Sequence, residues 1–242
     1  AISQKSKAGV FSGIIGFLSI GVSVLTGERT NFLIRACGGI LASIVWKPKL
    51  VLLSMLILVE VLAVIIVLNI RPDLKVRFGK EFVEHIPLPL FENIDNKPHW
   101  GAWRGGIQQG LKTPVIGIGP SGTRYTCRNL DSNLPKWLPG KNYCGNHPHT
   151  YYIQLFAETG VVGLILGCFM FSSIIWTCFK ARRENFECPM AATAFVVPFG
   201  LFFPIQQFGS FYGQWNNLFT WFAIAFAISQ YQSWRKPKKI PH

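Results

Sequence analysis

The stretch "NHPHTYYIQLFAETGVVG", residues 146–163, decides how the second half of the chain folds. It places Pro148 and His149 directly before an apolar run that continues to about residue 178. Proline suits the first turn of a helix, because its missing N–H would have no partner there. We therefore predict a transmembrane helix over residues 151–178 that carries His149 in its first turn.

The spacing of the stretch also predicts which way His149 faces. At ~100° per residue, Gly160 and Gly163 share the helix face of His149, whereas Glu158 points to the opposite side. Two glycines let a neighbouring helix approach closely, so this face is expected to pack inside the protein. The positive end of the helix dipole favours a neutral imidazole, which can act as a general base. A histidine that only caps the helix is the alternative.

Composition points to a membrane protein. Half of the 242 residues are hydrophobic, only 14% are charged and the mean hydropathy is +0.31. The net charge of +13 comes from Lys and Arg residues that lie between long apolar stretches. They do not form one basic face with interleaved aromatic residues, which argues against nucleic acid as a partner. We expect an all-α integral membrane protein whose partners include the lipid bilayer.

Hydrophobic windows of about 19 residues predict about six transmembrane helices. Their ranges are 8–26, 30–46, 50–70, 151–178, 189–207 and 216–232. In the chain ends and short connections, basic residues cluster on one side only: Lys5, Lys7, Lys47, Lys49, Lys180, Arg182, Arg183, Arg235, Lys236, Lys238 and Lys239. Such clusters stay in the cytoplasm. Three spans within residues 1–70 are thus followed by a periplasmic loop, 71–150, and by three spans and a basic tail within 151–242, with both termini cytoplasmic.

Two cysteines of the predicted loop, Cys127 and Cys144, would face an oxidising compartment and are candidates for a disulfide. Two unlinked thiols are the alternative. A metal site built from these cysteines with His147 and His149 lacks the CxxC or HxxxH spacing of such sites. No metal is therefore expected.

Residues 149–163 resemble the signature of the O-antigen ligase and polymerase superfamily of bacterial membrane glycosyltransferases. That signature reads His, then Asn, Ser or Gln, nine residues, Gly, two residues and Gly. His149, Gly160 and Gly163 match it. Only Thr150 departs from the pattern, since it keeps a hydroxyl but has no amide.

Two further stretches are similar to segments of the same superfamily. "WRGGIQQGLKTPVIGIGPSGTRY", residues 103–125, has its Trp, Pro and Gly-x-Gly at the matching places, and "TGERTNFL", residues 26–33, is similar to an outward-facing arginine turn that contains Arg29. The resemblance covers about residues 8–205. Typical members have additional spans before the arginine turn, so we expect this chain to be the C-terminal part of a longer protein.

The resemblance implies transfer of a glycan from undecaprenyl diphosphate to an acceptor hydroxyl at the periplasmic face of the bacterial inner membrane, without a cofactor. The acceptor is a sugar of lipid A core in ligases and another lipid-linked repeat unit in polymerases, and both remain open here. His149 is implied as the general base, and Arg29 as the cation that stabilises the departing diphosphate.

Further arginines are candidates for substrate binding, because a planar guanidinium donates bidentately to phosphate oxygens. They are Arg35, Arg104, Arg124 and Arg128. The loop of residues 71–150 holds eleven Lys and Arg against six Asp and Glu, which fits an anionic substrate.

Two other classes of function stay open. An anionic-solute transporter would use Arg35 and Glu60 to line a path gated by His149, and it predicts helices broken at mid-membrane. A structural membrane anchor for an envelope complex would tolerate the loss of His149.

Overall fold

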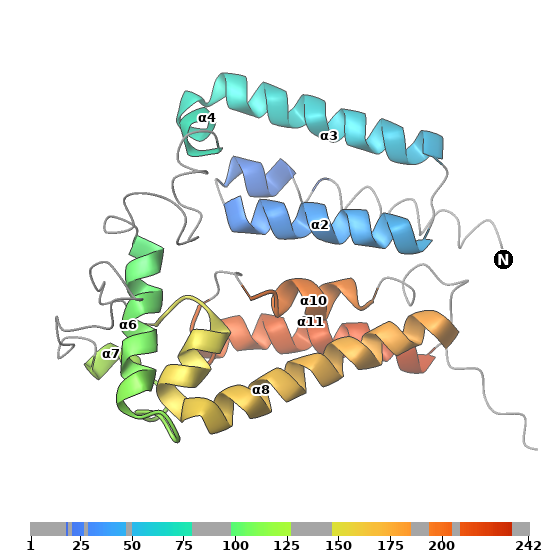
Figure 1. Cartoon of the computed structure of the whole chain (residues 1–242). Helices are drawn as coiled ribbons and strands as arrows, with labels where there is room; N and C mark the ends of the chain where they lie inside the picture. The colour runs from blue at the N-terminus through green and yellow to red at the C-terminus, as the bar shows by residue number, and fades with distance from the viewer. Residues whose placement is uncertain are drawn as a thin grey trace, which may run out of the picture. The chain divides into compact units, whose positions relative to one another are not determined.

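The computed structural model describes residues 18, 21–26, 29–46, 50–78, 98–126, 147–184, 194–204 and 209–233. Within these ranges the regular structure is entirely helical, as the sequence predicts (Figure 1). The helices are α2 (Arg29–Trp46), α3 (Leu50–Ile70), α4 (Pro72–Phe78), α6 (Pro98–Lys112), α7 (Thr123–Thr126), α8 (Tyr151–Glu184), α10 (Val196–Leu201) and α11 (Gln214–Ser233). Helices α2, α3, α8 and α11 coincide with four of the predicted spans.

The chain divides into two compact units. The first contains residues 1–79, 173–201 and 222–242, and the second contains residues 80–172 and 202–221. Helices α8 and α11 each contribute to both units. His149 and the segments around it all belong to the second unit.

Small residues bring the helices of the first unit together. A Cβ atom on Gly38 of α2 would lie 2.9 Å from Val196 Cγ1 of α10, and one on Gly200 would lie 3.2 Å from Ile34 Cγ2. Glycine at such crossings lets helix backbones approach closely, a packing mode common in membrane proteins. One buried hydrophobic cluster of this unit contains Cys178, Ala194, Phe195 and Ala227.

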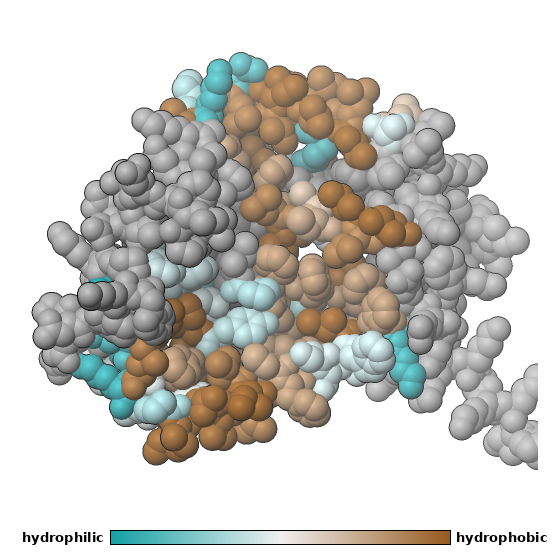
Figure 2. Space-filling view, viewed as in Figure 1, coloured by the Kyte–Doolittle hydropathy of each residue, from teal (hydrophilic) through white to brown (hydrophobic). Residues whose placement is uncertain are grey.

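One described helix, residues Tyr151–Lys180, is long and apolar enough to cross a membrane. Only 17% of its most apolar window is buried, unlike the core helix of a soluble protein. Shorter apolar helices cover Asn31–Leu41 and Ile57–Ile70 within the same described ranges. Figure 2 shows hydrophobic side chains over α3 and around the bend of α8. The count of six spans stays a prediction.

The predicted span at 189–207 is wrong as one continuous helix. Within residues 194–204 the helix covers only Val196–Leu201, and the chain leaves it before Pro204. A proline disfavours helical conformation in the residue before it. The carbonyl of Phe202 instead accepts a 2.6 Å hydrogen bond from the Tyr152 hydroxyl, so this segment supports the start of α8.

The second unit shows that the predicted loop of residues 71–150 is partly helical. Helix α6 lies tightly against α8: a Cβ atom on Gly106 would lie 2.6 Å from Ile153 Cγ2 and 2.8 Å from Pro148 Cγ. One turn further along α6, a Cβ atom on Gly110 would overlap the ring of Phe156. Glycines four residues apart therefore form the contact face of α6.

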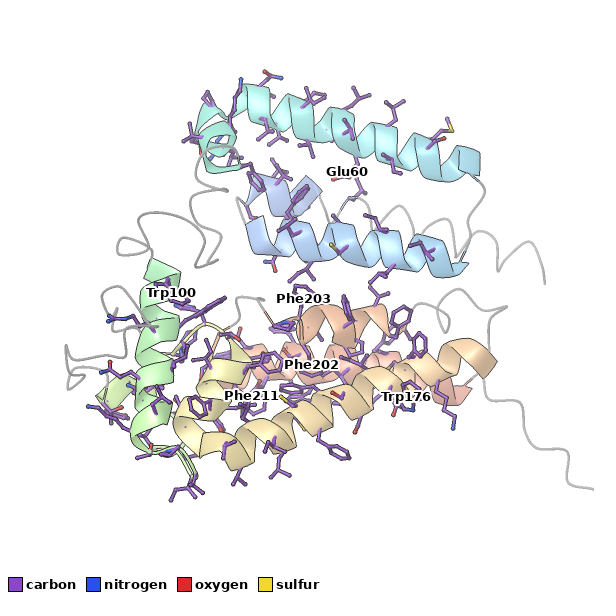
Figure 3. The ribbon with its side chains drawn as sticks, viewed as in Figure 1. Glu60, Trp100, Trp176, Phe202, Phe203 and Phe211 are labelled. Atoms are coloured by element: carbon purple, nitrogen blue, oxygen red, sulfur yellow. The ribbon has the colours of Figure 1, made fainter. Side chains whose placement is uncertain are left out.

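Aromatic side chains fix the start of α8 within the second unit. The rings of Phe171 and Phe202 stack with centroids 4.0 Å apart, and Phe211 meets Tyr151 edge to face at 5.2 Å (Figure 3). Aromatic pairs of this kind contribute roughly 0.5–1.5 kcal/mol beyond their burial. They tie Phe202 and Phe211 to the helix that follows His149.

Candidate active site

Helix α8 is broken at Gly160, whose φ of 67° and ψ of −166° are not helical. In a continuous helix the N–H groups of Val161 and Val162 would donate to the carbonyls of Ala157 and Glu158. Here they donate instead to Pro114 O at 2.7 Å and Val115 O at 3.4 Å.

The two carbonyls that lose these partners are also satisfied. Ala157 O accepts from Ile118 N at 3.0 Å, and Glu158 O accepts from Gly119 N at 2.9 Å. Residues 114–119 therefore replace the broken helix bonds with four hydrogen bonds of their own. Because each backbone group finds a partner, the break costs little in unmade hydrogen bonds.

Two glycines allow the backbone of residues 114–119 to approach α8 closely at the break. A Cβ atom on Gly160 would overlap the Val115 carbonyl, and one on Gly117, which has φ of 68°, would overlap the Glu158 backbone. The expectation that the signature glycines admit a neighbouring helix is wrong: Gly160 admits the backbone of residues 114–119. A Cβ atom on Gly163 would meet the side chain of Thr159 in the same helix.

Glu158, just before the break, is fully buried at 0% exposure. Its carboxylate accepts hydrogen bonds from Ser121 N at 2.8 Å, from Thr123 N at 3.3 Å and from the Thr123 hydroxyl at 2.5 Å. The side-chain amide of Gln154 donates a further bond at 3.2 Å. A buried carboxylate is tolerated only with such a set of donors. Glu158 thus fixes residues 121–123 on α8.

Gln154 extends this network to the segment before α11. Its amide nitrogen donates to the Ser210 hydroxyl at 2.8 Å, and its oxygen accepts from Phe211 N at 2.8 Å. The neighbouring Tyr212 also lies close to Glu158: burial raises the pKa of the Tyr212 hydroxyl, and the negative charge of Glu158 raises that pKa further. A hydrogen bond with Thr159 acts in the opposite direction.

Helix α6 is linked to the network through α7. The side-chain amide of Gln109 donates to the Thr126 hydroxyl at 3.0 Å and to Thr123 O at 3.4 Å. Gln109 and Thr123 are both buried. Helices α6 and α7, the start of α8 and residues 210–212 are therefore connected by one set of buried polar groups.

His149 does not lie in the first turn of α8, contrary to the prediction. It has a left-handed backbone with φ of 63°, and the helix begins only at Tyr151. Thr150 stands between them, its carbonyl accepting the first helical bond from Gln154 N at 3.0 Å. The Thr150 hydroxyl donates to Pro204 O at 3.2 Å, which anchors the residue next to His149.

The imidazole of His149 is half-buried and contacts that of His147, with ring centroids 4.4 Å apart. Histidine is one of the few residues besides glycine that adopt the left-handed region with some frequency. An uncommon backbone conformation held in place by packed neighbours is typical of functional positions. The chain thus presents His149 on an anchored turn directly before α8.

Two of the candidate arginines lie in the described part of the second unit. Arg104 of α6 is 6% exposed, whereas Arg124 of α7 is exposed. Arg124 directly follows Thr123, the residue that donates twice to Glu158. The carboxylate of Glu158 therefore holds the segment that carries Arg124.

Two other candidate arginines, Arg29 and Arg35, belong to the first unit, whereas His149 belongs to the second. Arg29 is the first residue of α2, and Arg35 is an exposed residue of the same helix, in the first unit. The side chain of Arg29 and all of Arg128 lie outside the described residues.

The predicted disulfide and the expected absence of a metal both stay predictions. Cys127 and Cys144 lie outside the described residues, so their proposed disulfide stays a prediction. Of the other cysteines, Cys37, Cys168 and Cys178 are free thiols. Within the described ranges no three His, Cys, Asp or Glu side chains gather in a way that could hold a metal ion.

Comparison with known proteins identifies one family. The family profile described as O-antigen ligase matches residues 14–168, which include Arg29, His149 and Glu158. Searches among curated proteins and among solved structures gave no match.

Proposed function

Since the chain belongs to the O-antigen ligase family, a family of inner-membrane proteins, we propose that it transfers a glycan from undecaprenyl diphosphate to an acceptor hydroxyl. The transfer takes place at the periplasmic face of the inner membrane, with lipid A core as the acceptor and without a metal ion. The polymerase reaction of the same superfamily is the alternative.

The observation that carries this proposal is the placement of His149. The hydrogen bond from the Thr150 hydroxyl to Pro204 O anchors its left-handed turn. Its ring is half-buried, so part of it is exposed. A general base must be held in place and yet be reachable by the hydroxyl that it deprotonates. His149 meets both conditions.

In the proposed reaction, His149 accepts the proton of the acceptor hydroxyl while the hydroxyl oxygen bonds to the anomeric carbon of the donor glycan. The bond between this carbon and the diphosphate oxygen breaks, and its electron pair leaves with undecaprenyl diphosphate. The negative charge that develops on the leaving group needs cations close by.

Arginines supply these cations in the proposal. Arg124 is exposed on a segment that Glu158 holds against α8, so its guanidinium can meet a diphosphate with little reorganisation of the backbone. Arg29 takes the role that the superfamily resemblance implies, and Arg35, Arg104 and Arg128 remain further candidates. The candidates are arginines because a planar guanidinium donates bidentately to phosphate oxygens.

The transporter alternative predicts helices broken at mid-membrane, and α8 is broken at Gly160. In transporters, however, the backbone groups freed by a broken helix bind the solute. Here the carbonyls of Ala157 and Glu158 and the N–H groups of Val161 and Val162 are all bonded to residues 114–119. These groups are not available to a solute, which favours the glycosyltransferase.

A transfer assay tests the proposal directly. Purified protein in lipid nanodiscs is given a lipid-linked glycan extracted from the producing bacterium, together with either lipid A core or a second lipid-linked unit as acceptor, in the presence of EDTA. We expect product on lipid A core. Product only on the second lipid-linked unit would establish the polymerase reaction instead. No product with either acceptor would contradict both, and activity lost on adding EDTA would contradict a metal-free reaction.

A further inference from the structure

The burial of α8 changes at its break. From Tyr151 to Gly160 most side chains are buried or half-buried against other parts of the second unit. Directly after the break the helix becomes exposed, with Val162 49% and Ile165 62% accessible. The two parts of α8 are thus surrounded differently.

The exposed part forms one continuous apolar face. Val162, Ile165, Leu166 and Phe169 follow a spacing of three and four residues and so lie on one side of the helix. Leu166 is 63% and Phe169 is 71% exposed. This face belongs to the candidate membrane span of the chain, which indicates that lipid covers it.

The connection between α6 and α7 adds two apolar side chains to the start of this face. Val115 is 58% exposed and Ile116 is 77% exposed. Val162 N donates to Val115 O at 3.4 Å, so the two segments touch. We name the surface made by Val115, Ile116, Val162, Ile165, Leu166 and Phe169 the apolar strip.

Part of the backbone of the connection is hydrogen-bonded within the protein. Irregular backbone is tolerated at membrane depth only when its polar groups are bonded within the protein. Pro114 O and Val115 O accept from Val161 and Val162, and Ile118 N donates to Ala157 O. Lys112, at the end of α6, is exposed and can reach the headgroups, as lysines at membrane boundaries do.

We propose that the apolar strip is a lipid contact, with the tip Val115–Ile116 inserted into the acyl-chain region and the outer membrane boundary at the break of α8. The tip belongs to the sequence segment predicted to be wholly periplasmic. From Val161 to Phe179 the helix rises about 27 Å, close to the ~30 Å hydrocarbon core. The part of α8 before the break and His149 lie outside that core.

Photo-crosslinking tests this placement without depending on glycan transfer. The full chain carries p-benzoylphenylalanine in place of Ile116 or, as a positive control within the span, in place of Phe169. Both side chains are largely exposed, so the substitutions leave the core intact. After irradiation in nanodiscs of defined phosphatidylethanolamine and phosphatidylglycerol, mass spectrometry of the peptides identifies adducts and locates them on acyl chain or headgroup.

We expect acyl-chain adducts at position 116 with a yield within about threefold of that at position 169. The proposal is overturned if position 169 forms lipid adducts while position 116 forms none, or if those at position 116 are confined to headgroups. It is equally overturned if position 116 crosslinks chiefly to a second copy of the chain, since the tip would then be a protein contact.

Discussion

The Thr123 hydroxyl donates a 2.5 Å hydrogen bond to the carboxylate of Glu158, which is fully buried in α8. This contact joins residues 35 positions apart in sequence and fixes the turn that carries Arg124. Glu158 is therefore a positioning residue in our proposal and not a group that touches the substrate.

Replacing Glu158 with Gln should release the turn. The new amide nitrogen would face backbone or hydroxyl donors, and a buried donor without a partner costs about 1–3 kcal/mol. We expect faster amide hydrogen exchange in residues 117–126, a higher KM for the lipid-linked donor and a lower unfolding temperature. Asp73→Asn is the control, because Asp73 forms an exposed ion pair with Arg71 that adds little to stability. Unchanged exchange in residues 117–126 of Glu158→Gln would contradict the positioning role.

The two glycines of the His signature should respond differently to Ala. At Gly160 an Ala would be strained by about 1–3 kcal/mol from its backbone alone, and its Cβ would overlap the Val115 carbonyl. At Gly163 the new Cβ would meet only the side chain of Thr159. We expect the unfolding temperature in detergent to fall most for Gly160→Ala, less for Gly163→Ala and not at all for Gly39→Ala, where the space is open. A Gly160→Ala protein as stable as the native one would show that the break is dispensable.

The sequence predicted the helices correctly where apolar runs are long, as in α2, α3 and α8. It missed the break at Gly160, because helical periodicity assumes a straight helix and the break depends on residues 114–119, far away in sequence. The same assumption placed Glu158 on the side opposite His149 and gave it no role. One signal could have found it: a carboxylate inside an apolar run needs partners to be tolerated. The glycines of "GIGPSG", residues 117–122, indicate a backbone able to approach closely enough to provide them.

Substitutions of Arg29 and Arg124 should have different effects on glycan transfer. Arg29→Ala should abolish most transfer, because the charge of the departing diphosphate loses a stabilising group. Arg29→Lys keeps the charge but loses the bidentate fork, so we expect it to remain strongly impaired. Arg124→Ala should mainly raise the KM for the donor and leave the unfolding temperature unchanged, since Arg124 is exposed. A mostly active Arg29→Lys enzyme would mean that Arg29 acts only as a point charge.

The orientation predicted from the basic clusters has a simple test. A cysteine in place of Lys97, just before α6, should react with a membrane-impermeant maleimide in intact spheroplasts, as shown by peptide mass spectrometry. A cysteine in place of Lys180, near the C-terminal end of α8, should react only after the membrane is permeabilised. The reverse pattern would invert the topology and place His149 in the cytoplasm, which would remove the proposed periplasmic reaction.

The His149 variants test the general base itself, and the left-handed backbone decides which substitution is informative. Ala at φ of 63° costs about 1–2 kcal/mol in conformational strain, so loss of activity in His149→Ala would mix two effects. Asn tolerates this conformation but cannot replace imidazole as a base, and Gly adopts it freely. We expect His149→Asn and His149→Gly to keep the native unfolding temperature and to lose roughly a hundredfold to ten-thousandfold in transfer rate. His147→Ala removes the ring 4.4 Å away and should reduce the rate much less. Near-normal turnover by His149→Asn, measured with donor and acceptor both saturating, would refute His149 as the base.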